Sequence, residues 1–213
     1  GPRAGAPRQI LWRVYTQRAI LCSGATERSI AFADNDRPGI LHAGALRAYM
    51  NRWAAAPSAT IAVFTNNDDG HRTARDALTH GLNVAAVIDT RAEVPESADF
   101  RVIAGAEVCG SWGRRGLKGI TYRKGRGTAL RLECGALGVS GGWNPNVHLT
   151  CHHRGRPVWQ EDIAAFVPAE SGVPGLSVAG AAAGLFSTQA ALRSGARAAA
   201  EALNDIGRPC QPA

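Results

Sequence analysis

The segment AVFTNNDDGHRTARDAL, residues 62–78, places charged and amide side chains directly after an apolar run. The order of apolar run, polar turn and helical pattern is how a dinucleotide-binding unit begins. The turn of such a unit usually reads G-x-G-x-x-G, so that a pyrophosphate reaches the backbone N–H groups at the start of the helix. Here Thr65 and Asn67 stand at the first two glycine positions, and only Gly70 remains.

Two carboxylates at the mouth of this turn oppose a bound phosphate. Asp68 and Asp69 repel a dianion and occupy the helix N-terminus that would otherwise attract it. Either one is expected to cap a helix that reaches about His80, with His71 as a partner of Asp68. Asp89, about twenty residues further on, stands where a ribose-binding acid would lie. We therefore expect the architecture to persist without the usual dinucleotide site of this turn.

The surrounding pattern predicts the elements that position these side chains. Apolar strands over 59–64 and 83–88, with the helix between them, form a βαβ unit with parallel strands. Strands over 101–109, 117–123 and 128–134 are separated by glycine-rich turns and predict an antiparallel meander. The fold class is therefore α/β, with Rossmann-like βαβ units and a β-meander.

Three further turns of small residues follow apolar strands: LCSGATER, VSGGWNPN and VAGAAAG. Small residues let the backbone run close to a flat or phosphorylated ligand. The elements predicted around these turns are two short strands within 8–22, a helix over 43–53, strands over 136–139 and 176–179, and an alanine-rich helix over 187–203.

The net charge of +7 has one local source. The segment 113–131 contains seven cations and no carboxylate, and the remaining 17 Lys and Arg balance the 17 Asp and Glu of the chain: the seven are Arg114, Arg115, Lys118, Arg123, Lys124, Arg126 and Arg131. Such a segment is either a solvated hairpin or a site for a phosphate or another anion. Without an aromatic ladder around it, nucleic acid is the weaker reading, and we expect no nucleic-acid partner.

The five cysteines are widely spaced and form no CxxC, which argues against a disulfide framework and a zinc ribbon. His148, Cys151, His152 and His153 lie close together, but their H-x-x-C-H-H spacing matches no standard zinc pattern. We therefore expect packing or interface roles for them and no metal. The cysteine pattern fits a reducing, cytoplasmic location. No apolar stretch approaches the roughly 18 residues of a membrane span, so we expect no membrane association.

The glycine turns resemble motifs of known flavoproteins. LCSGA resembles the A-T-G turn of the two-dinucleotide FAD/NAD(P)-binding class, which includes glutathione reductase, and SGGWNPN resembles its G-x-x-P-N turn. VPGLSVAGAAAG resembles its closing motif, with Ala181 where an Asp usually stands. Longer strings resemble the alpha subunit of heterotetrameric sarcosine oxidase over nearly the whole chain: FADNDRPGILHAGALRAYMNRW, FTNNDDGHRTARDAL, NVAAVIDTR, GRRGLKGI and SGGWNPNVHLTCHHRGRPVW.

This resemblance implies a function. The chain would be a cofactor-binding and electron-transfer part of an oxidoreductase that demethylates sarcosine to glycine with formation of hydrogen peroxide. The family holds FMN between the alpha subunit and a beta-type flavoprotein subunit, holds FAD within that partner, and passes a one-carbon unit to folate. It implies no catalytic residue in this chain, and an NAD-type site at Ser23, Gly24, Ala25, Gly180, Ala181 and Ala182.

The resemblance also implies a domain organisation. Residues 1–57 would be a partial first dinucleotide-binding domain, 58–135 an inserted Rossmann-like domain with the meander, and 136–213 the return to the first domain. The family's alpha subunit begins with a glycine-rich strand–turn–helix for the NAD pyrophosphate and continues into a folate-binding domain. Neither lies within these 213 residues, which also lack an initiator Met. We therefore expect a central part of that subunit, inactive alone.

The family suggests a specific role for the turn that carries Arg114, Arg115 and Lys118, here called the basic turn. An FMN phosphate at a subunit interface needs nearby cations, and Arg114, Arg115 and Lys118 lie on a glycine-flanked turn suited to it. Two alternatives stay open. One is a subunit of a related amine or amino-acid dehydrogenase, such as a cyanide-forming glycine oxidase or an opine oxidase. The other is a non-catalytic Rossmann-like assembly domain that presents a basic patch.

Overall fold

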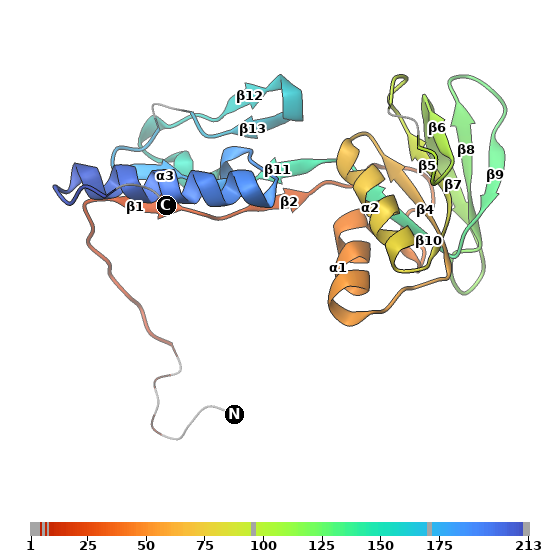
Figure 1. Cartoon of the computed structure of the whole chain (residues 1–213), viewed down its shortest axis with the longest axis horizontal. Helices are drawn as coiled ribbons and strands as arrows, with labels where there is room; N and C mark the ends of the chain where they lie inside the picture. Colours follow the sequence, from red (N-terminus) through yellow and green to blue (C-terminus); the bar gives the residue numbers. More distant parts are fainter. Residues whose placement is uncertain (1–4, 6, 8, 95–96, 170–171, 211–213) are drawn as a thin grey trace. The chain divides into compact units, whose positions relative to one another are not determined.

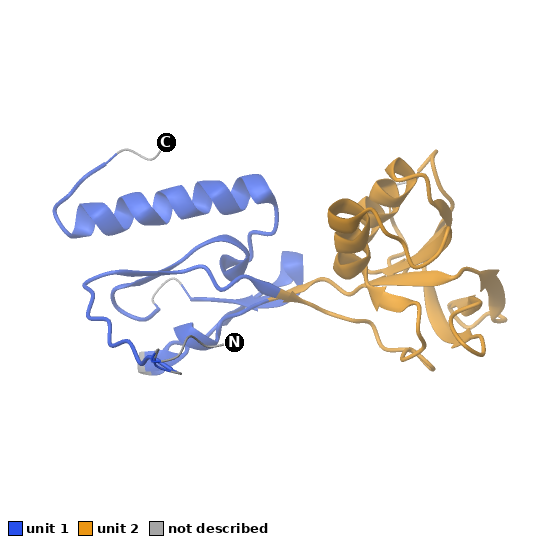
Figure 2. Ribbon diagram, turned by 90° about the horizontal axis from the view of Figure 1, so that it is seen from below, with its two compact units in different colours: residues 1–25, 145–213 blue, residues 26–144 orange. Residues whose placement is uncertain are grey.

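The computed structural model describes residues 5, 7, 9–94, 97–169 and 172–210. The chain divides into two compact units, shown in different colours in Figure 2. Unit 1 consists of Gly1–Ala25 and Pro145–Ala213, and unit 2 is the continuous segment Thr26–Asn144. Unit 2 is therefore inserted into unit 1 in the sequence.

A five-stranded parallel sheet forms the centre of unit 2. Its strands, in spatial order, are β3 (Ile40–His42), β10 (Ala136–Ser140), β4 (Thr60–Thr65), β5 (Asn83–Asp89) and β6 (Val102–Ala104). Two helices, α1 (Ala43–Trp53) and α2 (Asp68–Thr79), cover one face of this sheet (Figure 1). Parallel strands need such crossovers, and here α2 connects β4 to β5.

An antiparallel meander covers the other face of the sheet (Figure 1). It consists of β7 (Ala106–Trp112), β8 (Gly119–Lys124) and β9 (Leu130–Glu133). Alternation along β4 serves both faces, since Ile61 and Val63 pack in the cluster with the helices, while Ala62 and Phe64 pack in the cluster with the meander. The predicted α/β class with a βαβ unit and a meander is confirmed.

Two boundaries differ from the sequence-based expectation. Residues 102–104 were expected in the meander, but they pair with β5 in the parallel sheet, and Gly105, with a φ of +65°, separates them from β7. Unit 2 also extends beyond 58–135 on both sides. The reason is that β3, α1 and β10 pack into the same sheet and core as β4.

Unit 1 is built on a parallel pair of short strands, β1 (Ala19–Leu21) and β14 (Leu176–Val178). Helix α3 (Thr188–Asp205) contacts both strands, and the Ser187 hydroxyl caps it by accepting from the Ala190 N–H at 3.2 Å. A hairpin of β12 (Val158–Gln160) and β13 (Ala165–Val167) belongs to the same unit. Of the two strands expected within 8–22, the described residues contain only β1.

The remaining elements are short. Strands β2 (Ala25–Glu27) and β11 (Trp143–Pro145) form a two-stranded sheet whose residues fall on both sides of the division. Single turns of 3-10 helix occur at His148–Thr150, His152–Arg154, Glu161–Ile163 and Gly180–Ala183. None of the helices in the described part of the chain has the length and apolar character that a membrane span requires.

Candidate functional site

The strand order of the unit 2 sheet reverses between β10 and β4, which is where open α/β sheets usually bind ligands. Asn67 fills this position. Its Nδ2 donates to the Ser140 carbonyl oxygen at 3.0 Å, and the Ser140 hydroxyl donates to Asn67 Oδ1 at 3.2 Å. The Asn66 N–H donates to the same carbonyl at 3.3 Å. Protein groups therefore close the crevice in which a dinucleotide would normally lie.

The N-terminus of α2 is satisfied by its own turn. Asn67 is the N-cap, and its Oδ1 accepts from the Asp69 N–H at 3.0 Å. The Thr65 hydroxyl accepts from the Asn67 N–H at 3.1 Å. The expectation that Asp68 or Asp69 caps the helix is wrong, because both lie in its first turn, where their charge favours the helix dipole.

Gly70 retains the one role of the glycine motif that the fold still needs. A Cβ atom at this position would overlap the side chain of Thr65, so α2 packs against the end of β4 with no space for a methyl group. Close packing of helix on strand is the role of the third glycine in G-x-G-x-x-G. The two glycine positions that would let a pyrophosphate approach the backbone carry Thr65 and Asn67. The third position, which lets the helix pack against the strand, is still a glycine, Gly70.

The carboxylate of Asp69 is paired inside the unit. Arg47 on α1 bonds Asp69 Oδ1 through Nη1 at 3.1 Å and Asp76 Oδ2 through Nε at 2.7 Å. The Trp143 indole N–H lies 3.4 Å from Asp69 Oδ2. Arg47 thus joins the two helices and pairs with one of the two carboxylates of the turn, Asp69.

The N-terminus of α1 is filled in the same way. The Gly44 N–H lies 3.0 Å from both carboxylate oxygens of Glu27, on β2. Burial raises the pKa of Glu27 above its ordinary value, against the opposing effect of the Gly44 hydrogen bond. Both helices of unit 2 therefore direct their N-terminal N–H groups at protein acceptors rather than at open space for a phosphate.

Asp89, at the position of a ribose-binding acid, is fully buried and fully bonded. Its oxygens accept from the Arg91 guanidinium at 3.1 and 2.9 Å and from the Arg91 N–H at 2.9 Å. His71 Nε2 lies 2.8 Å from Asp89 Oδ2, so the expected pairing of His71 with Asp68 is wrong. Asp68 instead pairs with Arg91 Nη1 at 2.8 Å. This arrangement leaves no oxygen of Asp89 directed at a ligand.

The charge of Asp89 is stabilised despite its burial. Burial by itself would raise the pKa of this carboxyl, but the hydrogen bonds from Arg91 and His71 outweigh it and hold the pKa below its ordinary value. The same bond to Asp89 raises the pKa of Arg91. The cluster of His71, Asp89, Arg91 and Asp68 is therefore a structural ion-pair network.

The residues predicted for an NAD-type site follow two paired strands of unit 1. Strands β1 and β14 are parallel neighbours with Leu21 paired to Val178, and the Ala179 N–H donates to the Leu21 carbonyl at 3.0 Å. Parallel neighbouring strands have their carboxyl ends on the same side of the sheet, so Ser23 and Gly180 both follow their strands on that side. The pairing thereby brings together the two sequence-predicted groups, Ser23, Gly24 and Ala25 with Gly180, Ala181 and Ala182.

Each of these turns has a defined shape. Gly24 and Gly180 have φ values of +73° and +69°, which L side chains rarely adopt. The Ser194 hydroxyl accepts from the Gly180 N–H at 3.3 Å, and this anchors the second turn to α3. Asn146 closes on the first turn, because its Nδ2 donates to the Ser23 carbonyl at 3.0 Å and the Ser23 hydroxyl donates to the Asn146 carbonyl at 2.9 Å.

The basic turn lies between β7 and β8. Arg114, Arg115 and Lys118 are exposed, and no described residue forms an ion pair with them. Arg37 fixes the base of the turn, with Nε donating to the Ser111 hydroxyl at 3.0 Å and Nη1 donating to the Gly113 carbonyl. The three cations therefore project from an ordered backbone.

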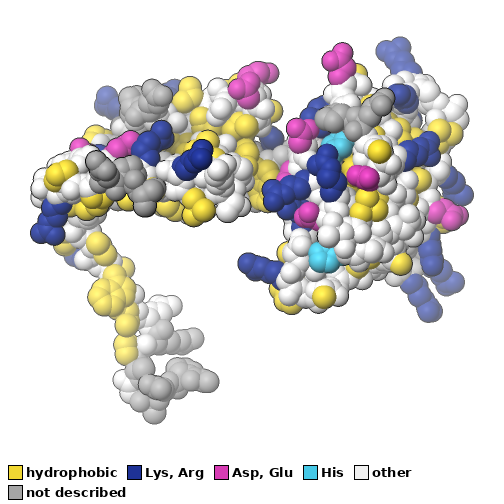
Figure 3. All heavy atoms as spheres, viewed as in Figure 1, with side chains coloured by type: hydrophobic (Ala, Val, Ile, Leu, Met, Phe, Trp, Pro, Cys, Tyr) yellow, Lys and Arg dark blue, Asp and Glu magenta, His cyan; other side chains and the backbone are white. Residues whose placement is uncertain are grey.

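The seven cations of 113–131 do not form one patch, contrary to the sequence interpretation. The pairing of Trp112 with Gly119 places the turn at one end of β8, while the pairing of Ala106 with Lys124 places Arg126 beyond the other end. A strand of this length separates its ends by roughly 17–20 Å. On the face seen in Figure 3, Lys and Arg side chains of unit 2 are dispersed and do not gather in one place.

Sequence reasoning missed several side chains that shape these sites. They are Glu27, Arg47, Arg91 and Asn146, each of which bonds to a residue distant in sequence or to the buried Asp89. Only Arg91 carried a local signal, since it follows the acid by two positions. Among the described residues, no three His, Cys, Asp or Glu side chains are grouped so that they could hold a metal ion, and this applies to His148, Cys151 and His152. The side chain of His153 lies outside the described part of the chain.

The sequence is similar to known proteins over nearly its full length. It is 39% identical over 213 residues to sarcosine oxidase subunit alpha of Rhizobium meliloti (strain 1021), covering 99% of the chain and 21% of the relative. It is 36% identical over 217 residues to sarcosine oxidase subunit alpha of Corynebacterium sp. (strain P-1), covering 96% and 22%. The chain thus spans about a fifth of the length of these relatives. No protein-family model matches it.

The fold is similar to those of a thioredoxin reductase and an L-proline dehydrogenase. The structure matches thioredoxin reductase of T. acidophilum with a TM-score of 0.69 at 16% identity, over 88% of the chain and 65% of that protein. It matches L-proline dehydrogenase from P. horikoshii with a TM-score of 0.66 at 19% identity, over 92% and 36%. At such identities these matches establish the architecture alone.

Proposed function

Since the chain resembles a fifth of sarcosine oxidase subunit alpha along nearly its whole length, we propose that it is the cofactor-binding and electron-transfer part of such a subunit. The parent oxidoreductase would demethylate sarcosine to glycine and form hydrogen peroxide. The chain itself supplies no catalytic residue, and FAD and the amine site belong to a beta-type partner subunit. The one-carbon product would pass to folate outside this chain.

The observation that carries this proposal is the joint position of the two glycine turns of unit 1. In this function NAD lies against Ser23, Gly24 and Ala25 on one side and Gly180, Ala181 and Ala182 on the other. The paired ends of β1 and β14 support it, because they bring both turns to one edge. The closed crevice of unit 2 supports it as well, because it removes the competing dinucleotide site.

The NAD-type site is tested with Gly180→Val in the complex with a beta-type subunit. A valine at a φ of +69° is strained, and its Cβ would lie 3.6 Å from Ala191 Cβ on α3, so its larger side chain distorts the turn. The NAD released from the purified complex, measured by enzymatic cycling, should fall at least tenfold. Gly195→Ala is the matched control, because a Cβ there meets nothing within 4 Å. Unchanged NAD content in a folded Gly180→Val complex would contradict the proposal.

The basic turn is proposed to hold the phosphate of an FMN shared with the beta-type subunit. Three exposed cations without carboxylate partners among the described residues suit an anion at an interface. Replacing Arg114, Arg115 and Lys118 by Ala should reduce the FMN recovered from the co-purified complex severalfold. A control variant with the same loss of charge replaces Arg72, Arg75 and Arg126 by Ala. An equal loss of FMN in both triple variants would contradict the assignment.

A second candidate function applies to unit 2 by itself. Asn67 occupies the place where the strand order reverses, and protein acceptors bind the N–H groups at the start of α1 and α2. Both observations favour an assembly role for this unit, in which it keeps the Rossmann shape without binding a nucleotide. Co-expression separates the two readings. A complex whose released flavin includes FMN as well as the FAD of the partner supports the flavoprotein function, and a stable complex that releases only the FAD of the partner supports assembly alone.

A further inference from the structure

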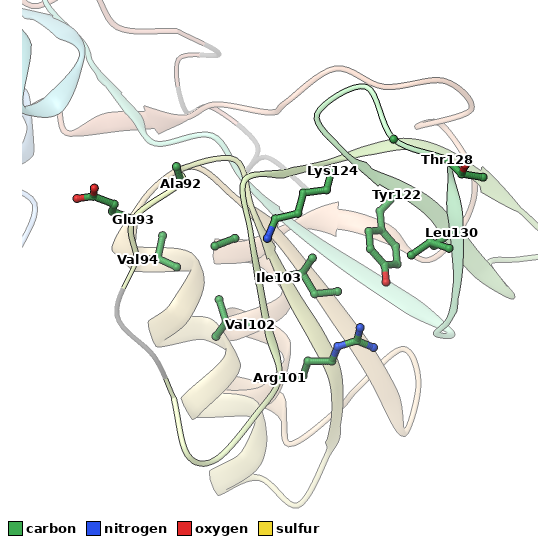
Figure 4. A pocket seen from close by; sticks show the side chains of 12 residues that line it. Ala92, Glu93, Val94, Arg101, Val102, Ile103, Tyr122, Lys124, Thr128 and Leu130 are labelled. Carbon is green, nitrogen blue, oxygen red and sulfur yellow. The ribbon is translucent and has the colours of Figure 1, made fainter.

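We infer that unit 2 contains a binding site for a small organic anion at the edge of its sheet, away from the cofactor turns. The site lies between β6 and the β8–β9 hairpin, in a pocket of about 700 Å³. Figure 4 shows the side chains that line it. The inference goes beyond the proposed function and does not depend on it.

The size of the pocket and its apolar lining suit a small ligand. Pockets of about 300–1,000 Å³ with an apolar lining and a few polar groups are typical of small-molecule sites. Val94, Val102, Ile103 and Leu130 supply the apolar lining here. These residues offer a surface to the apolar part of a ligand.

The hydroxyl of Tyr122 is the first polar group. The side chain belongs to the core between sheet and meander and is only 5% exposed. The hydroxyl forms no hydrogen bond with any described residue, and it is not among the buried unpartnered side-chain atoms of the described residues, so it is accessible from the pocket. Tyr122 lines the pocket, and Figure 4 shows its hydroxyl directed toward the side on which Arg101 lies. A ligand acceptor would satisfy this donor.

Two cations complete the polar part of the site. Arg101 precedes β6 and Lys124 ends β8, and neither forms an ion pair with a described residue. Lys124 stands two positions after Tyr122 and so shares its face of the strand. The lysine stem runs past Gly105, where an added Cβ would lie at an ordinary contact distance of 3.6 Å from Lys124 Cε. In Figure 4 the carboxylate of Glu93, on the rim, is directed away from the other side chains.

Together these groups define the chemistry of the ligand. Two unpaired cations and one hydroxyl donor recognise an anionic head that accepts several hydrogen bonds, either a carboxylate or a phosphate. The apolar lining recognises a short hydrocarbon or aromatic body. The ligand is therefore a small carboxylate or phosphate ester with an apolar substituent, rather than a dinucleotide.

Ligand-observed NMR on the full chain tests this site with three probes of similar shape: benzoate, phenyl phosphate and benzamide. Benzoate or phenyl phosphate should give saturation-transfer signals, and comparing the two tells which anionic head is preferred. Neutral benzamide should bind at least tenfold more weakly. Tyr122→Phe should weaken the preferred anion about fivefold, and Arg101→Gln about tenfold.

Matched variants make the outcome decisive. Arg72→Gln removes a surface cation of unit 2 outside the pocket and should leave the affinity unchanged. Melting curves of each variant verify that unit 2 remains folded. The inference is overturned if neither anion binds at 10-fold excess over about 1 mM chain, if benzamide binds as well as benzoate, or if Arg72→Gln weakens binding as much as Arg101→Gln.

Discussion

His71 and Asp89 form a buried contact between helix α2 and the end of strand β5, with His71 Nε2 2.8 Å from Asp89 Oδ2. Their side chains are 4% and 0% exposed, and Arg91 completes the bonding of the carboxylate. A residue that resembles a ribose-binding acid in the sequence is therefore a structural anchor in the fold.

Replacing this anchor should destabilise unit 2. Asp89→Asn keeps the shape of the side chain but leaves Arg91, among the described residues, with Asp68 as its one charged partner. We expect the free energy of unfolding to fall by about 2–3 kcal/mol, less than for a fully buried pair because Arg91 is partly exposed. Urea denaturation followed by circular dichroism measures it, with the exposed Asp99→Asn as control. A loss below 0.5 kcal/mol would show that the network is not stabilising.

The same network should make stability depend on acidity. The pKa of Asp89 is lower in the folded chain than its ordinary value of 3.8, so the unfolded chain binds the proton first. The contribution of Asp89 is therefore complete above that value and is lost as the pH falls through the folded value. Urea midpoints of the wild-type chain and Asp89→Asn should converge between pH 5 and about pH 2. Parallel curves over this range would refute the assignment.

Gly70 and Gly195 should respond to alanine with opposite signs. At Gly70 the added methyl group overlaps Thr65, and overpacking of this kind costs about 1–3 kcal/mol. At Gly195, inside α3, the methyl group meets nothing within 4 Å, and alanine gains about 0.5–1 kcal/mol through helix propensity. Thermal melting of both variants measures the difference. A neutral Gly70→Ala would mean that α2 moves freely against β4.

The cysteines should differ sharply in reactivity. Burial raises the pKa of the Cys134 thiol to about 12, whereas Cys22, Cys151 and Cys210 are exposed. Iodoacetamide at pH 8 should modify the exposed three and leave Cys134 unmodified until urea unfolds the chain, because the reactive thiolate is scarce and shielded. Mass spectrometry of the peptides follows each site. The thiol ionises more easily in the unfolded chain, where its pKa is the ordinary 9.0, than in the folded chain. Its ionisation therefore lowers the stability of the fold as the pH rises above 9.0.

The parts of the fold that follow from local pattern were predictable from the sequence. The alternation of apolar runs and polar turns gave the βαβ unit, and helix α1 was expected over the residues that form it, Ala43–Trp53. The residues of β6 were expected in the meander, because an apolar run predicts a strand but does not indicate which strand it pairs with. Its assignment depends on hydrogen bonds to β5, which lie outside the local sequence.

The sequence predicted which dinucleotide-binding features the candidate site lacks better than it predicted the contacts between side chains there. The missing glycines at 65 and 67 indicated a closed turn, and the side chain of Asn67 closes it. The identity of the cap was missed because Asn67, Asp68 and Asp69 are all good N-caps and the choice depends on where the helix begins. Pairs such as Arg47 with Asp76, 29 positions apart, leave no local pattern.

The insertion of unit 2 into unit 1 has a consequence for synthesis of the chain. Strand β1 must wait for β14, more than 150 residues later, before its hydrogen bonds can form. Unit 2 is contiguous, so all of its strands are synthesised before that partner. We therefore expect the second unit along the chain to fold first and the flanking segments to meet only afterwards, at a rate limited by closure of a long loop.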